Sequence, residues 1–338
     1  MKVAVPTISQ LHIKSYYGFR YLLDPDWHQK VFEKLGLSSN PNMKVLDLYP
    51  GPGIHSAVLY NKVQPQQYTM MECRRDFLSN LRNIYTDGPM ELVKKDPYKW
   101  ESYTELIDQE KLFVPKKADY NVVNKNFYIM ANLTEKKHEG LLMQWMNCVG
   151  NRNWLFRFGR SPMLIWMPTP TASKLLADSG DHSRHKCSLV REAFTDTKLV
   201  ALSQEEDMKS FNSVCLDKSN PLVIPDGTDY GGKDFPIALV EFTPKKHDID
   251  LDNWEFVTKH LMVLYKTPLI DAIDCLGHGA RDYFSANIDK DHIHLLKKCP
   301  QDFTNNDFVY LTNLFHLWPF KPDVYMDFLD IYQEESRE

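Results

Sequence analysis

The segment Val45-Leu-Asp-Leu-Tyr-Pro-Gly-Pro-Gly-Ile54 is the most informative part of the sequence. Residues 44–48 predict a buried strand, and a helix is expected to begin near His55. Gly51 and Gly53 lie in the turn between them, where glycine lets the backbone bend sharply and approach a ligand without a Cβ in the way. The segment therefore predicts a nucleoside-binding turn or, as the plainer alternative, a tight turn without a ligand.

Acidic residues follow the next two predicted strands. Glu72 ends the second strand and Asp96 follows the third, where a carboxylate can bind ribose hydroxyls. A nicotinamide dinucleotide fold would need a third glycine shortly after Gly53, and the sequence has none there. Asp47, within the first strand, is more typical of methyltransferases. The pattern indicates a nucleoside-binding α/β domain.

Strand-like and helix-like segments alternate as far as about residue 244. The strands are expected at 44–48, 68–72, 90–93, 127–131, 163–167, 199–202 and 237–242. This alternation predicts a mainly parallel sheet with helices on both faces and ligands at the carboxyl ends of the strands. Later helices are expected at 253–265, 268–276, 291–297 and 305–318. We therefore expect an α/β domain at 1–246, a small helical domain at 247–321 and an acidic tail at 322–338.

The composition excludes several classes of protein. The 338 residues are 43% hydrophobic and 12% aromatic, which is enough for a substantial core. The sequence contains no apolar run of roughly eighteen residues, so it does not predict a membrane-spanning helix. The six cysteines form no Cys-x-x-Cys pair, so the sequence indicates neither a metal site nor a disulfide framework.

Charge is unevenly distributed along the chain. The net charge of −5 equals that of residues 322–338, which hold six acids and one base. Residues 151–191 hold seven bases and two acids, which predicts a phosphate-facing surface or, as the plainer alternative, a solvated face. The first 23 residues contain no acid, a bias typical of mitochondrial targeting.

The sequence also resembles a known family. Gly18-Phe-Arg-Tyr-Leu-Leu-Asp24 is similar to the Gly-Gln-Asn-Phe-Leu-x-Asp motif of the ribosomal RNA adenine dimethyltransferases. The resemblance implies a Rossmann-like S-adenosylmethionine methyltransferase fold with a small C-terminal all-helical domain. It also implies a former cofactor pocket formed by Leu22, Gly51, Gly53, Glu72, Asp96 and Asn132.

Nearly the whole chain resembles the fungal mitochondrial transcription factor B family. The segments that carry this resemblance include 44–51, 96–98, 153–155, 182–184, 190–199 and 318–323. The resemblance implies a specificity factor of the mitochondrial matrix that helps the single-subunit mitochondrial RNA polymerase to recognise and melt promoters. It implies that no cofactor is required and that any S-adenosylmethionine binding is a remnant.

Three departures from the enzyme pattern predict that the chain does not transfer methyl groups. The enzymes carry Asn-Leu-Pro and then Tyr or Phe after the fourth strand, where the ring stacks on the target adenine, whereas this chain has Asn132-Leu-Thr-Glu135. Tyr49 replaces the first glycine of the cofactor turn, and Phe19 and Arg20 replace Gln-Asn. The sequence leaves two alternatives open: an active mitochondrial rRNA adenine N6-dimethyltransferase, and a scaffold that binds polymerase without touching DNA.

Promoter melting needs aromatic rings for unpaired bases and cations for phosphates. The candidates for contact with melted, single-stranded promoter DNA are Tyr98, Trp100, Arg157, Lys174, His182, Arg184, Lys186 and Cys187. Core packing is the alternative for Trp100, and residues 178–186 are expected to form an exposed loop. The resemblance implies that the tail, with Tyr325, Phe328 and Tyr332, enters the polymerase cleft near the template strand. Packing of the tail as a last helix is the alternative.

Overall fold

The computed structural model describes residues 2–7, 18–85 and 88–323. Its contacts divide the chain into two units. The first holds residues up to 145, 155–172 and 196–244, and the second holds 146–154, 173–195 and the residues from 245 onward. This division differs from a single boundary at 246, because the segments 146–154 and 173–195 group with the residues from 245 onward.

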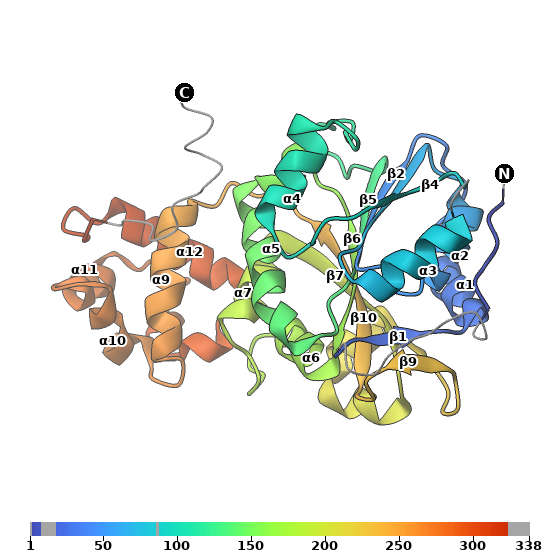
Figure 1. Ribbon diagram of the computed structural model, residues 1–338. Coiled ribbons are helices and arrows are strands. Elements are labelled where there is room, and N and C mark those ends of the chain that lie inside the picture. Colours follow the sequence, from blue (N-terminus) through green and yellow to red (C-terminus); the bar gives the residue numbers. More distant parts are fainter. Residues whose placement is uncertain (1, 8–17, 86–87, 324–338) are drawn as a thin grey trace. The chain divides into compact units, whose positions relative to one another are not determined.

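The first unit is built on an eight-stranded sheet with the strand order β4-β3-β2-β5-β6-β10-β7-β8 (Figure 1). The strands are β2 (Lys44–Leu48), β3 (Gln67–Met71), β4 (Met90–Val93), β5 (Phe127–Asn132), β6 (Met163–Pro168), β7 (Thr195–Leu202), β8 (Leu222–Val223) and β10 (Ile237–Pro244). β2 pairs in parallel with β3 and β5, and β10 runs antiparallel to β6. The predicted α/β class and mainly parallel sheet are confirmed. A separate two-stranded sheet joins β1 (Arg20–Leu22) to β9 (Tyr230–Gly232).

Helices connect these strands. They are α1 (Pro25–Lys34), α2 (Ile54–Val63), α3 (Arg75–Tyr85), α4 (Trp100–Thr104), α5 (Glu139–Asn151), α6 (Thr169–Leu176) and α8 (Ser213–Ser219). Asp24 caps α1 by accepting hydrogen bonds from the backbone N–H groups of Asp26 and Trp27. The buried face of α3 carries Phe77 and Leu81 at helical spacing. These local signals explain why the chain turns from strand to helix where it does.

The turn after β2 lies where the strand order reverses direction. β3 and β5 flank β2, so the carboxyl end of β2 is a topological switch point, the usual ligand site of such sheets. Tyr49, Gly51 and Gly53 all have positive φ angles there, of 56°, 57° and 77°. A Cβ added at Gly51 would lie 2.2 Å from the ring of Tyr21, so only glycine is accommodated at that position.

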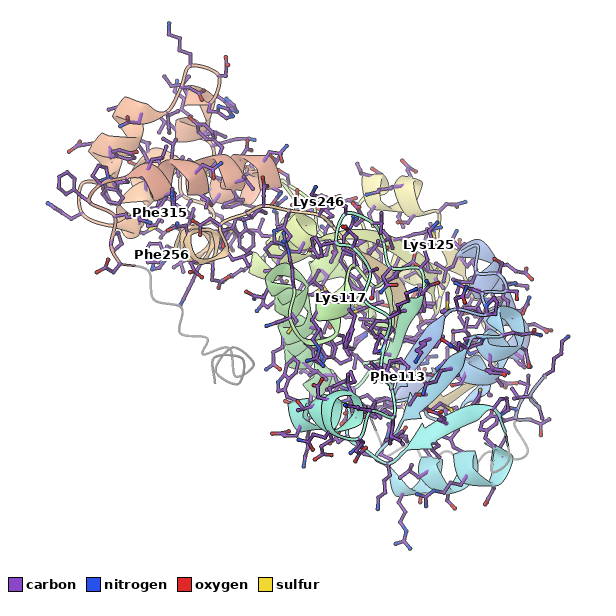
Figure 2. All side chains as sticks on the ribbon, turned by 90° about the horizontal axis from the view of Figure 1, so that it is seen from above. Phe113, Lys117, Lys125, Lys246, Phe256 and Phe315 are labelled. Carbon is purple, nitrogen blue, oxygen red and sulfur yellow. The ribbon has the colours of Figure 1, made fainter. Side chains whose placement is uncertain are left out.

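The second unit is helical. It contains α7 (Lys186–Phe194), α9 (Leu251–Val263), α10 (Leu269–Ala272), α11 (Ala280–Asn287) and α12 (Asn305–Leu317). Phe256 of α9 stacks on Phe315 of α12 with ring centroids 5.1 Å apart (Figure 2). Trp254, also of α9, is buried and packs against Phe194. The predicted helix at 291–297 is a short 3₁₀ turn, Ile293–Lys297, and α11 had not been predicted. Within the described residues, no helix is long and apolar enough to cross a bilayer.

Candidate functional site

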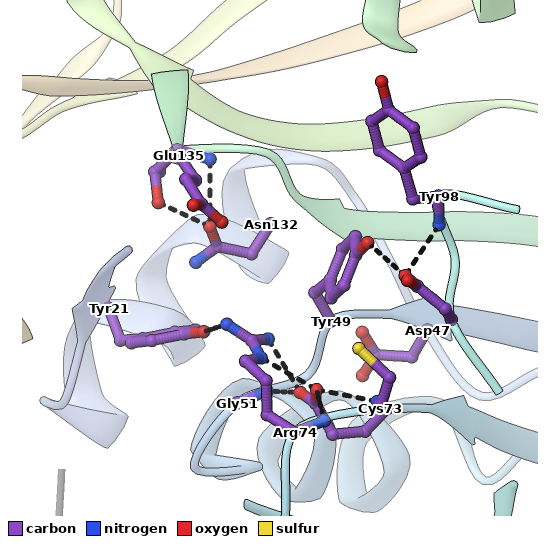
Figure 3. Close-up of polar contacts among 12 residues, drawn as sticks. Tyr21, Asp47, Tyr49, Gly51, Cys73, Arg74, Tyr98, Asn132 and Glu135 are labelled. Carbon is purple, nitrogen blue, oxygen red and sulfur yellow. Dashed lines mark hydrogen bonds and ion pairs between the residues drawn. The ribbon is translucent and has the colours of Figure 1, made fainter. Parts of the chain in front are cut away.

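Asp47 of β2 lies beside the turn (Figure 3). Its carboxylate is fully buried and accepts hydrogen bonds from Ser56 Oγ at 2.6 Å and Tyr68 OH at 2.8 Å. His55 Nε2 lies 3.1 Å from both of its oxygens. The carboxylate is therefore committed to the protein interior and holds the start of α2 against the sheet.

Glu72 lies at the carboxyl end of β3 and is fully buried. It accepts hydrogen bonds from the backbone N–H groups of Gly51 at 3.3 Å and Cys73 at 2.9 Å. The guanidinium of Arg74 forms an ion pair with the same carboxylate, with Nη2 2.8 Å from Oε2 and Nε 2.9 Å from Oε1. The oxygens that would bind a ribose are thus occupied by an arginine of the same chain.

Arg74 and Tyr21 occupy the part of the predicted nucleoside pocket next to Glu72 and Gly51. Arg74 Nη1 donates to Tyr21 OH at 2.7 Å, and the guanidinium lies 3.8 Å from the ring centroid of Phe19. The ring of Tyr21 packs against Gly51. Leu22, the next residue of β1, is also buried. The glycine turn is therefore bordered by the ring of Tyr21 and the guanidinium of Arg74, both from the same chain (Figure 3).

Tyr49 engages the second predicted acid. Its hydroxyl donates to Asp96 Oδ1 at 2.7 Å, and the backbone N–H of Tyr98 donates to the same oxygen at 3.0 Å. Burial, reinforced by Asp96, raises the pKa of Tyr49 above its usual range. The Tyr49 ring stacks on His138 with centroids 4.8 Å apart. Tyr49, which stands where the enzymes have a glycine, thus links the turn to Asp96 and to His138.

Asn132 also points its amide inward. Its Nδ2 donates to the carbonyl of Arg20 at 2.9 Å, and its Oδ1 accepts from the backbone N–H and the hydroxyl of Thr134 at 3.1 and 2.7 Å. Thr134 stands where the enzymes have proline. The amide thus ties β1 to the end of β5, so it is not free to orient a target amine.

A cavity of about 420 Å³ remains above these residues. It is lined by Phe19, Tyr49, Cys73, Arg74, Asp96, Tyr98, Glu135, Lys137 and His138. His138 is buried, and neither of its ring nitrogens has a hydrogen-bond partner among the residues that the structure describes. Sequence reasoning missed Tyr21, Arg74 and His138. The position of Arg74, two residues after Glu72, was a detectable signal that a cation could pair with this carboxylate. Among the described residues, no cluster of histidine, cysteine and acidic side chains is placed to hold a metal ion.

Comparison with known proteins decides the family. A family model described as "Ribosomal RNA adenine dimethylase" matches residues 10–313. The "Mitochondrial transcription factor 1" of Saccharomyces cerevisiae is 49% identical over 341 residues, covering 99% of both chains. That of Lachancea kluyveri is 49% identical over 340 residues, covering 99% of this chain and all of the relative. The chain belongs to the mitochondrial transcription factor 1 group of the ribosomal RNA adenine dimethylase family.

A solved structure confirms the predicted fold. The crystal structure of a dimethyladenosine transferase from Plasmodium falciparum superimposes with a TM-score of 0.57 at 14% identity, covering 87% of this chain and 97% of that one. At that identity the likeness shows the fold alone. The fold is therefore the Rossmann-like methyltransferase fold with a helical C-terminal region, as predicted.

The candidate DNA-binding residues predicted from the sequence are distributed over both units. In the first unit, Tyr98 is 47% exposed, Trp100 is half-buried with its ring centroid 6.4 Å from that of Tyr103, and Arg157 forms an ion pair with Asp108 at 2.5 Å. In the second unit, Lys174 and His182 are exposed, Cys187 is half-buried and Lys186 forms an ion pair with Glu255. Tyr325, Phe328 and Tyr332 lie outside the described residues.

Arg184 requires a correction. The segment 178–186 was expected to be an exposed loop, but Arg184 is fully buried and its Nη2 forms an ion pair with Glu192 at 2.7 Å. The segment is fastened to the second unit by Gly180 N–H, which donates to the carbonyl of Gln301 at 3.2 Å, and by Ser179 Oγ, which donates to that of Asp302 at 2.6 Å. The guanidinium faces the interior, so we remove Arg184 from the DNA-facing set.

The Arg184–Glu192 pair gives a stability prediction. Glu192→Ala leaves a buried guanidinium without its carboxylate, so we expect the free energy of unfolding to fall by about 3–5 kcal/mol in urea denaturation. The double substitution Arg184→Met with Glu192→Leu removes both charges and should recover most of that loss. Glu206→Ala, on the exposed surface, is the control. A Glu192→Ala variant as stable as this control would show that Arg184 is solvated.

Two buried histidines predict how stability depends on pH. Burial, together with the charges of Lys137 and Arg74, lowers the pKa of His138 to about 3. Burial, together with the neighbouring His55, lowers the pKa of His28 to about 3. Between about pH 6.5 and about pH 3 the unfolded chain binds these protons and the folded chain does not. Stability should therefore decrease as the pH falls below about 6.5, by about 1.4 kcal/mol per pH unit for each histidine. Urea unfolding at several pH values measures the slope, and an unchanged slope in His138→Phe would contradict the assignment of His138.

Proposed function

We propose that this chain is a mitochondrial transcription initiation factor that retains the methyltransferase fold without methyltransferase activity. In this proposal it works in the matrix, partners the single-subunit mitochondrial RNA polymerase, and stabilises the unpaired strand of a melted promoter. The names of relatives at 49% identity over 99% of the chain support a mitochondrial role in transcription. The observation that carries the non-catalytic part is the occupation of the nucleoside pocket by Arg74 and Tyr21.

An S-adenosylmethionine molecule would have to displace this arginine. Its ribose is neutral, so it would leave the charge of the fully buried Glu72 without the cation that now lies 2.8 Å away. Separating a buried ion pair in this way costs about 3–5 kcal/mol, a cost that would be subtracted from the affinity for the cofactor. This supports a protein that requires no cofactor.

The acceptor side of the site supports the same conclusion. Methyl transfer relies on holding donor and acceptor in near-attack geometry, an effect of up to about 7–11 kcal/mol. Here the amide of Asn132 is bonded to Arg20 and Thr134, and Glu135 stands where the enzymes stack an aromatic ring. Neither group is available to position an adenine.

The rim of the cavity supports a role with unpaired bases. Tyr98 is about half exposed on the lining of the cavity, and the side chain of Lys137 on the same cavity is 64% exposed, with its Nζ 3.1 Å from the carboxylate of Glu135. An exposed ring can stack on a base whatever its identity, and a neighbouring ammonium can contact the phosphate. A cavity of about 420 Å³ is large enough for a base or part of one.

The proposal predicts that S-adenosylmethionine does not bind. Isothermal calorimetry should give no heat of binding at millimolar cofactor, and small-subunit rRNA incubated with labelled cofactor should acquire no label. Asn132→Ala should leave promoter-dependent transcription largely intact in a folded protein. Stoichiometric labelling of the rRNA would instead establish the alternative, an active mitochondrial rRNA adenine N6-dimethyltransferase.

A further inference from the structure

Residues 111–126, here called the amino-edge strap, cross the edge of the sheet opposite to the cavity. The carbonyl of Leu112 accepts from Gln67 Nε2 at 2.7 Å, at the start of β3. The carbonyl of Val114 accepts from Lys44 Nζ at 3.0 Å, at the start of β2. Ala118 N–H donates to the carbonyl of Phe158 at 3.0 Å, just before β6. Because these strands are parallel, their starts lie along one edge of the sheet.

The amino-edge strap is held rigidly by its backbone. The buried Asn124 donates from Nδ2 to the carbonyls of Lys116 at 3.1 Å and Phe158 at 2.9 Å. Arg160 Nη1 donates to the carbonyl of Asn121 at 3.3 Å. Since carbonyls along the strap are used internally, its exposed side chains are what it presents to a partner.

Four lysines of the strap have no carboxylate partner within the described residues. Lys111, Lys116, Lys117 and Lys125 are all exposed and form no ion pair there. Figure 2 labels two of them, Lys117 and Lys125. The one acid of the strap, Asp119, accepts a hydrogen bond from the backbone N–H of Asn121 at 2.7 Å. Outside the strap, Lys95 is paired with Glu105 and Glu110, whereas Lys44 and Arg160 donate to backbone carbonyls of the strap. The strap therefore presents four exposed lysines against a single aspartate.

Exposed apolar side chains lie between these lysines. Leu112, Val114 and Val122 are 51%, 43% and 56% exposed, whereas Phe113 is turned inward and packs on Phe127. A phosphate backbone would match the lysines but would leave the apolar side chains without a partner. An acidic protein surface that carries apolar side chains matches both, and protein interfaces combine such apolar contacts with complementary charge.

We propose that the amino-edge strap docks a protein partner that presents carboxylates around apolar side chains. The choice of mitochondrial RNA polymerase as that partner rests on the proposed function. β2 has five residues, so the strap lies roughly 17 Å from the turn that borders the cavity. A partner bound at the strap would leave the cavity open to a melted strand.

Charge reversal of the strap tests this inference. The variant carries Lys116→Glu, Lys117→Glu and Lys125→Glu, and its control carries the same change at three exposed lysines elsewhere in the first unit, Lys209, Lys218 and Lys233. Binding of each full-length protein to purified mitochondrial RNA polymerase is measured without DNA and at several salt concentrations. We expect the strap variant to bind at least about tenfold more weakly and with a smaller salt dependence, and the control to bind like the wild type.

A second variant tests the apolar part of the surface. Leu112→Ser with Val122→Ser changes no charge and should also weaken polymerase binding, by about fivefold, while both variants bind a pre-melted promoter bubble normally. Normal polymerase binding by the strap variant would overturn the inference, as would weakened bubble binding, which would assign the lysines to nucleic acid. Failure of the wild type itself to bind polymerase would overturn the proposed function instead. Melting curves verify that each variant is folded.

Discussion

Replacing Arg74 by alanine is expected to lower the free energy of unfolding by about 3–5 kcal/mol. The substitution leaves Glu72, which is fully buried, with backbone N–H donors but no cation. It also removes the donor to Tyr21 OH and the cation from the face of the Phe19 ring. Urea denaturation followed by tryptophan fluorescence measures the loss, and we expect cofactor binding to remain undetectable because Tyr21 still packs on Gly51.

Arg75 provides the matched control for this measurement. It is adjacent in sequence and exposed, so Arg75→Ala should change the stability by no more than about 0.5 kcal/mol. The double variant Arg74→Met with Glu72→Gln removes both charges and should be more stable than Arg74→Ala alone. If Arg74→Ala were as stable as Arg75→Ala, the arginine would not be filling the pocket, and the argument against cofactor binding would lose its main support.

Replacing Tyr98 by alanine is expected to reduce transcription from a duplex promoter by about 5- to 100-fold, because one stacked base contributes about 1–3 kcal/mol. The same variant should be nearly normal on a template whose start site is already unpaired. Since Tyr98 is about half exposed, its removal should leave the folded protein intact. Run-off assays on the two templates with purified polymerase give the comparison.

Tyr98→Phe is the control, because it keeps the stacking ring and removes only the hydroxyl. It should retain most of the activity on the duplex template. Trp100 is half-buried, so Trp100→Ala requires a melting curve before its activity is interpreted. Equal losses on duplex and pre-melted templates would assign Tyr98 to polymerase binding or folding rather than to the capture of unpaired bases.

Much of the fold was predictable because it depends on local signals. The alternation of apolar segments, the glycines after β2 and the acid at the end of β3 predicted the strands and the position of the site. The assignment of the segments 146–154 and 173–195 to the second unit was not predictable. It depends on contacts between residues distant in sequence, such as that between Gly180 and Gln301. Periodicity within a segment carries no information about such partners.

The site was predicted in position and only partly in chemistry. Glu72, Asp96 and Asn132 lie where the pattern indicated, but each is bound to a side chain or carbonyl whose approach depends on tertiary structure. The prediction that Arg184 faces DNA was wrong for the same reason. A basic residue in a polar segment is usually exposed, and only the packing of α7 shows that Glu192 pairs with Arg184 in the interior. Composition cannot distinguish an exposed cation from a buried, paired one.

The most direct test of the central claim is a run-off transcription assay on a duplex mitochondrial promoter. Purified mitochondrial RNA polymerase is supplied alone, with this chain, and with this chain plus S-adenosylmethionine. The account predicts little specific transcript from polymerase alone, strong transcript of defined start when the chain is added, and no further change with the cofactor. Equal transcription with and without the chain, or transcription that requires S-adenosylmethionine, would contradict it.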